Sequence, residues 1–186
     1  MWWACSDFFK GQLSEIVKTL CRAESKFTDI EASVPKEWEE SLYYINTQGV
    51  RVRKSVVLYN LTWVEMLVNG ISMDKLRNIL SFFEKRKDVL FWWFVEPLKA
   101  EGEEIVRRIA PRTFGEYQQL VTEYHQKKWG IYDDSCFAGR AITYCDVYYG
   151  DPGEIGHRCE SEKKTVVLQS YEDANVDNIL CEMLNN

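Results

Sequence analysis

The sequence AITYCDVYYGDPGEIG, residues 141–156, decides the fold class that we predict for this chain. Its first nine residues are rich in branched and aromatic side chains, which favour β-strands. The glycines and the proline that follow favour a turn or a longer loop. A second apolar run of strand length, KTVVLQS, occupies residues 164–170. We therefore expect these two runs to pair as a small antiparallel sheet in the C-terminal third.

The sequence before this segment has mainly the period of amphipathic helices. Apolar side chains recur at helical spacing over residues 6–24, and Ser72 is predicted to cap another helix that begins at Met73. Residues 50–59 are an exception, because alternating and branched side chains there indicate a strand. A last helix is predicted for residues 171–184.

Length and composition fit a single domain that spans residues 1–186. A chain of this size buries about two thirds of its unfolded surface, and 46% of its residues are hydrophobic, so it can form a core without metals or disulfides. We predict an α+β fold with a mainly helical body of about six to eight helices at residues 1–130. Residues 131–186 are predicted to hold the small antiparallel sheet and a C-terminal helix.

The longest apolar run, residues 89–95, is far shorter than the roughly 20 residues of a membrane span. Its aromatic centre, residues 91–94, is too short for its period to distinguish a buried helix from a strand. The first residues lack the basic and apolar regions of a signal peptide. We therefore expect a soluble intracellular (cytoplasmic) protein with no membrane partner, whose six cysteines are free thiols.

Negative charge is concentrated in the C-terminal third. The chain has a net charge of −6, and from Ile131 onward eleven acidic residues stand against four basic ones. This distribution disfavours nucleic acid as a partner, because phosphate backbones bind basic surfaces. The alternative is a small nucleic-acid patch formed by Arg51, Arg53 and Lys54 on the strand predicted at residues 50–59.

The C-terminal third also contains four residues of the types that bind zinc. Cys136, Cys145, His157 and Cys159 provide the sulfur and nitrogen ligands of a tetrahedral site. Structural zinc sites usually have pairs of ligands with two to four residues between them, and this spacing contains no such pair. In a strand, however, His157 and Cys159 would face the same side. No cofactor is expected, and zinc is the one that this residue set would permit.

Two catalytic arrangements are further alternatives. Cys136 and His157 could act as nucleophile and base of a hydrolase, with Asp146 or Asp151 to orient the imidazole. The carboxylates and the lysine of a metal-dependent nuclease would be Asp146, Glu160, Glu162 and Lys163. The chain has no glycine-rich phosphate loop, which disfavours nucleotide-driven chemistry.

A non-enzymatic role in protein–protein interaction or assembly is the function that the composition favours. Seven tryptophans and ten tyrosines exceed what most cores of this size need, and such residues dominate binding hot spots. The tryptophans near a terminus or a helix end are expected at the surface: Trp2, Trp3, Trp38 and Trp129. The expected partner is another protein or a second copy of the chain.

Overall fold

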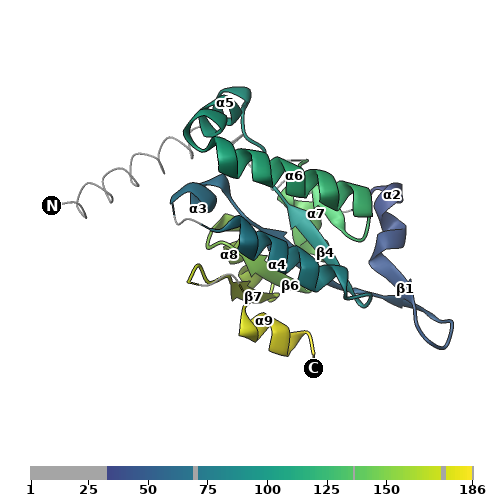
Figure 1. Cartoon of the computed structure of the whole chain (residues 1–186). Coiled ribbons are helices and arrows are strands. Elements are labelled where there is room, and N and C mark those ends of the chain that lie inside the picture. The colour runs from purple at the N-terminus through teal and green to yellow at the C-terminus, as the bar shows by residue number, and fades with distance from the viewer. Residues whose placement is uncertain (1–32, 69–70, 136, 173–174, 186) are drawn as a thin grey trace.

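The computed structural model describes residues 33–68, 71–135, 137–172 and 175–185. Its centre is a five-stranded parallel sheet with the strand order β5-β4-β3-β6-β7 (Figure 1). The strands are β3 (Ser55–Asn60), β4 (Val89–Phe94), β5 (Ile131–Asp133), β6 (Val147–Gly150) and β7 (Thr165–Leu168). A separate two-stranded antiparallel hairpin, β1 (Tyr43–Ile45) and β2 (Arg51–Arg53), projects from one end of the domain (Figure 1).

Helices cover both faces of the parallel sheet. One face carries α3 (Trp63–Val68), α4 (Met73–Glu84), α5 (Ala100–Ile109), α6 (Pro111–Lys127) and α9 (Asn178–Met183). The other carries α7 (Ala138–Tyr144), α8 (Glu154–Ser161), α2 (Lys36–Glu39) and the 3-10 helix η1 (Glu40–Leu42). Three layers result, as is usual when parallel strands are joined by helical crossovers.

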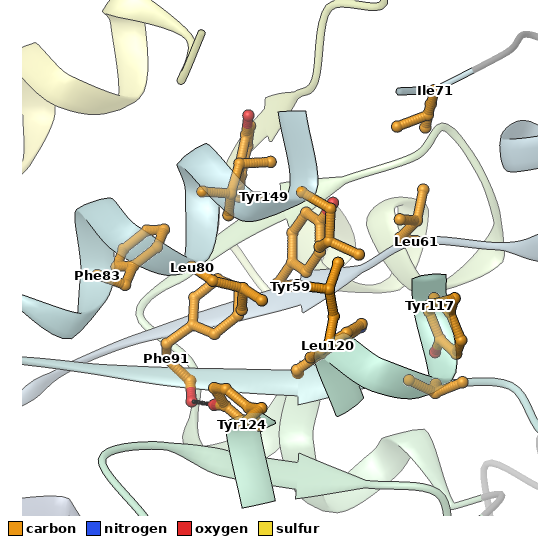
Figure 2. Packing of buried hydrophobic residues seen from close by; sticks show 14 of the residues in the cluster. Tyr59, Leu61, Ile71, Leu80, Phe83, Phe91, Tyr117, Leu120, Tyr124 and Tyr149 are labelled. Carbon is orange, nitrogen blue, oxygen red and sulfur yellow. Dashed lines mark hydrogen bonds between the residues drawn. The ribbon is translucent and has the colours of Figure 1, made fainter. Parts of the chain in front are cut away.

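Alternate side chains of each central strand enter different cores. Val57 and Tyr59 pack under α4, whereas Val56 and Leu58 pack under α7 and α8. All six residues of β4 are buried, so the aromatic run at 91–94 is a central strand. Figure 2 shows the larger core, where the Tyr124 hydroxyl donates to the Phe91 carbonyl oxygen at 2.8 Å.

The expectation of a small antiparallel sheet in the C-terminal third is wrong. β6 and β7 are parallel neighbours in the main sheet, and the antiparallel pair lies near the N-terminal end of the described residues. Parallel neighbours need a crossover, and helix α8 begins within the segment 150–156 that was expected to be a turn or a longer loop. Ile155 and Cys159 lie one turn apart on its buried face, while Gly156 packs against the ring of Tyr148. The fold is therefore a three-layer α/β sandwich rather than α+β.

Other sequence expectations have mixed outcomes. Ser72 caps α4 as predicted, since its Oγ accepts the Lys75 N–H at 3.1 Å. The strand predicted at residues 50–59 is divided between β2 and β3. The first half of the run 141–149 ends helix α7, and the last helix is shorter than the predicted 171–184. The helix predicted at residues 6–24 lies outside the described residues.

Candidate functional site

The order of the parallel strands changes direction between β3 and β6. The chain builds β4 and β5 on one side of β3, and then returns to its other side to build β6 and β7. The loops leaving β3 and β6 therefore lead to helices on opposite faces of the sheet. Ligands of doubly wound sheets bind in the crevice outside the carboxyl ends of the strands at this switch point. Residues 60–62 and 150–153 thus mark the candidate site.

β3 and β6 are in very close contact where they reach this edge. Gly150 pairs with Asn60 in parallel register, and a Cβ atom at residue 150 would overlap the Asn60 carbonyl oxygen. The Asp151 N–H donates to that same oxygen at 3.1 Å. Asn60 is buried, and its Nδ2 donates to the Phe94 carbonyl oxygen at 3.3 Å. The floor of the site is therefore tightly packed backbone.

We expect Gly150→Ala to lower the free energy of unfolding by about 1–3 kcal/mol, because the added methyl group overpacks the sheet. The atoms it meets are backbone atoms of the central strand, which cannot rotate aside. Gly153→Ala is the matched control, since a Cβ there meets nothing within 4 Å and the backbone is extended at φ 172°. Its effect should stay within about 0.5 kcal/mol. Urea unfolding measures both, and equal effects would show that the strands separate easily at this edge.

Asp151 ties three loops of the carboxyl edge together. Its buried carboxylate accepts the Thr62 N–H through Oδ2 at 2.6 Å and the Tyr171 hydroxyl through Oδ1 at 3.1 Å. Gln169 also donates to Oδ1 through its Nε2. The Gln169 Oε1 in turn accepts the Tyr59 hydroxyl at 3.2 Å. The loops that follow β3, β6 and β7 therefore share one hydrogen-bonded centre.

Burial raises the pKa of Asp151 to about 6, because the ionised carboxylate loses contact with water. The negative charge of Glu65 also raises this pKa, whereas the hydrogen bonds from Thr62 and Gln169 lower it. Burial likewise raises the pKa of Tyr59 well above its ordinary value, and it raises that of Tyr171. Both phenols therefore stay protonated at neutral pH, and the Tyr171 hydroxyl can keep donating to Asp151.

Glu96 brings a second carboxyl group to the same edge. It follows β4, the neighbour of β3, and is half-buried. Burial raises the pKa of Glu96, and the negative charge of Glu154, in the first turn of α8, raises it further. Within the described ranges, no residue donates a hydrogen bond to Glu96. Its carboxyl oxygens therefore have capacity to accept hydrogen bonds from a ligand.

Asp133, at the end of β5, is a third carboxylate of this edge but has a structural role. It is buried, and its Oδ2 accepts the Trp92 Nε1–H at 3.1 Å. Its Oδ1 accepts the Ser135 N–H at 3.0 Å. These bonds fix the start of the loop that follows β5, and they occupy both oxygens of the buried carboxylate.

The predicted zinc ligands are brought together only in part. Cys145 and Cys159 are both fully buried, with their sulfur atoms 3.9 Å apart. The side chain of His157 is 81% exposed, because on a helix residues two apart point in different directions. Cys136 lies outside the described residues. In the part of the chain that the structure describes, no group of three or more His, Cys, Asp or Glu side chains could hold a metal ion.

The residues of the two catalytic alternatives are also spread out. Asp146 pairs with Arg53 at 2.8 Å near the amino end of β6, whereas Asp151 is buried at its carboxyl end. His157 lies on the exposed side of α8. The other candidate nuclease residues lie exposed at the end of α8: Glu160, Glu162 and Lys163.

The predicted basic patch is partly neutralised by neighbouring groups. Arg53 also donates to the Tyr144 carbonyl oxygen at 2.8 Å, in addition to its pair with Asp146. Arg51 pairs with Glu40 at 3.0 Å, and its guanidinium lies 4.0 Å from the centre of the Tyr43 ring. Burial lowers the pKa of Lys54.

The two described tryptophans of the predicted interaction surface pack largely against the core. Trp38 is half-buried and meets Trp92 edge to face, with ring centres 5.5 Å apart. Trp129 is also half-buried, and its ring centre lies 4.9 Å from that of Tyr124. Trp2 and Trp3 lie outside the described residues.

Sequence reasoning did not single out Glu96, and it treated Asp151 only as a possible third member of a hydrolase. A usable signal was present, because each follows an apolar run directly: residues 89–95 before Glu96, and residues 147–150 before Asp151. Polar side chains at the carboxyl ends of parallel strands gather at one edge. The signal is hidden because residues 150–156 have the composition of a hairpin turn or a longer loop.

No protein-family model matches the chain, and no match was found among curated proteins or solved structures. None of the helices in the described ranges has both the length and the apolar character needed to cross a membrane. The function is therefore inferred from the geometry of the site.

Proposed function

We propose that this domain binds a small molecule containing a ribose, a nucleoside or nucleotide, in the crevice at the carboxyl ends of β3, β4 and β6. The observation that carries the proposal is the position of Glu96, immediately beyond the strand adjacent to β3. In doubly wound dinucleotide-binding folds, an acidic residue beyond the equivalent strand binds the ribose hydroxyl groups. This is an analogy of fold, to which the site adds a half-buried carboxyl group with free acceptor capacity.

The side chains at this edge of the sheet support ribose rather than phosphate as the recognised group. Carboxylate oxygens accept hydrogen bonds from hydroxyl groups, and a ribose offers two adjacent hydroxyls. The loop after β3, Asn60 to Thr62, contains no glycine that would let a phosphate approach the backbone. The negative charges of Glu96 and Glu154 also disfavour a phosphate beside them. Any phosphate of the ligand would therefore point away from these two side chains.

Calorimetric titration with adenosine, guanosine, cytidine, uridine and their 5′-diphosphates tests the proposal. For the tightest ligand, its 2′,3′-dideoxy analogue should bind wild-type protein about tenfold more weakly or worse, because hydrogen bonds to a charged group are lost. Glu96→Ala should bind both forms equally. Glu160→Ala, an exposed residue near the other end of α8, should keep the discrimination. If no compound of this panel binds, or if Glu96→Ala keeps the discrimination, the proposal is wrong.

A protein contact, which the composition predicts, is a second proposal, and hairpin β1–β2 favours it. Tyr43, Ile45 and Val50 are exposed on this hairpin, which projects from the domain (Figure 1). We expect self-association or partner binding at micromolar concentration to weaken in the double variant Ile45→Ser and Val50→Ser. Ile109→Ser, at an exposed position of α5, is the control. Sedimentation velocity measures this association. If all variants associate equally, the hairpin is not the contact surface.

A further inference from the structure

We propose that Cys145 and Cys159 form a reversible disulfide bond when the protein meets a hydroperoxide. The pair lies in the core on the α7–α8 face of the sheet, and the inference does not depend on the proposed ribose site. The two thiols are separated by 14 positions in sequence, and the fold brings them together. No other pair of sulfur atoms among the described cysteines is in contact.

The short separation of the two sulfur atoms supports this pairing. The sulfur atoms are 3.9 Å apart, and a disulfide bond is about 2.05 Å long, so closing the bond needs a shift of about 2 Å. Cys145 ends α7 with an extended backbone, and Cys159 lies on the buried face of α8. Rotation of the two side chains can provide much of this shift, because neither residue is held by a metal or by another disulfide in the described part of the chain.

Their mutual hydrogen bond gives the two thiols different roles. Either sulfur can donate this bond, and the Cys145 S–H can also donate to the Ile142 carbonyl oxygen at 3.2 Å. Donation from Cys145 to Cys159 stabilises the Cys159 thiolate and lowers its pKa, although burial opposes this effect. The same bond, together with burial, raises the pKa of Cys145. Cys159 is therefore the thiolate that reacts first, and Cys145 is the resolving thiol.

The reaction proceeds in two balanced steps. The Cys159 thiolate attacks one oxygen of the hydroperoxide, and the O–O bond breaks. The other oxygen takes up the proton that Cys159 released on ionisation and leaves as water or an alcohol. The product is a sulfenic acid on Cys159. The Cys145 sulfur then attacks the Cys159 sulfur and forms the S–S bond, and the hydroxyl group leaves with the Cys145 proton as water. Two electrons pass from the thiols to the hydroperoxide, and an added dithiol returns them.

Burial sets the rate and the consequence of the reaction. Both sulfurs are inaccessible, so oxidation requires the contact between α7 and α8 to open, and half-buried Cys181 should be modified earlier. The disulfide would close a loop that contains β6 and most of α8. Cross-linking a loop of this length restricts the unfolded chain, and should raise the midpoint of thermal unfolding by roughly 5–10 °C.

Peptide mapping of the whole protein gives a direct test. The protein is treated with hydrogen peroxide, blocked with iodoacetamide and digested with trypsin without reductant. Cleavage after Arg140, Arg158 and Lys163 places Cys145 alone in residues 141–158 and Cys159 alone in residues 159–163. We expect these two peptides to be recovered joined, and dithiothreitol to separate them. Recovery of Cys159 as a sulfinic acid, joined to another cysteine, or as a free thiol after Cys181 is fully oxidised would overturn the proposal.

Two variants separate the pair from the remaining cysteines. Cys181→Ser, on α9 at the opposite face of the sheet, should keep both the joined peptide and the rise in unfolding midpoint. Cys145→Ala should lose both effects of peroxide. The wild-type peptide map does not depend on how well either variant folds, so it decides the proposal even if the alanine variant is unstable.

Discussion

Replacing Asp177 by alanine is expected to lower the free energy of unfolding by about 3–5 kcal/mol. Asp177 is the charged partner of Lys75, whose side chain is only 1% exposed on α4, and the Nζ to Oδ2 distance is 3.4 Å. The Tyr149 hydroxyl also donates to Oδ2 at 2.5 Å, and the Ser170 N–H donates to Oδ1 at 3.0 Å. Removing the carboxylate therefore leaves a buried ammonium group without its counter-charge, and two further donors lose their acceptor.

A contrasting variant shows whether charge is the cause. Lys75→Met should be less destabilising than Asp177→Ala, because the charge it leaves, on Asp177, is 15% exposed and keeps its hydrogen bonds from Tyr149 and Ser170. Asp74→Ala, an exposed acidic residue on the same helix, should stay within about 0.5 kcal/mol. Urea unfolding at pH 7 measures all three variants. If Lys75→Met and Asp177→Ala are equally destabilising, the unpaired ammonium group is not what makes Asp177→Ala costly.

The second large effect is a loss of stability of about 2–3 kcal/mol as the pH rises from about 4 to about 7.5, caused by Asp151. Its pKa is about 6 in the folded protein, against an ordinary value of 3.8. Between these two values the folded state binds more protons than the unfolded state. The free energy of unfolding therefore falls as pH rises through this window, and the full stability is present only below the unfolded pKa.

The measurement compares wild-type protein with Asp151→Asn by urea unfolding at several pH values. Other titrating groups are common to both proteins and largely cancel in the difference. The amide cannot accept the hydrogen bonds of both Thr62 and Gln169, so the variant should be less stable by about 1–3 kcal/mol at low pH. This gap should narrow or reverse as the pH rises from about 4 to about 6, and it should level off above that. A difference that is constant from pH 4 to pH 7.5 would show that the Asp151 pKa is not raised by burial.

Individual elements of the fold could be predicted from local pattern, although the fold class could not. The capping hydroxyl of Ser72 and the helical spacing that follows it define the start of α4, because both act within one turn of helix. The branched residues of 55–60 form a strand, since their side chains suit a pleated surface. Such features depend on neighbours in sequence, and a sequence contains them directly.

The C-terminal third depended on contacts between distant segments. The run 141–149 has enough apolar residues for a strand or a buried helix, and the structure divides it between α7 and β6. β6 pairs in parallel with β3, about 90 residues earlier in the chain, so only the sheet decides which part is extended. Residues 154–161 form a helix because β7 lies parallel to β6 and must be reached by a crossover.

The candidate site also depends on contacts between distant segments. The sequence alone determined that Glu96 and Asp151 follow apolar runs, as well as the identity of every side chain that the site uses. Only the tertiary structure placed both residues at one edge of one sheet, and it changed their properties there, because burial raises the pKa of each carboxyl group. Strand order and burial arise from contacts between segments far apart in the chain, and local periodicity does not predict such contacts.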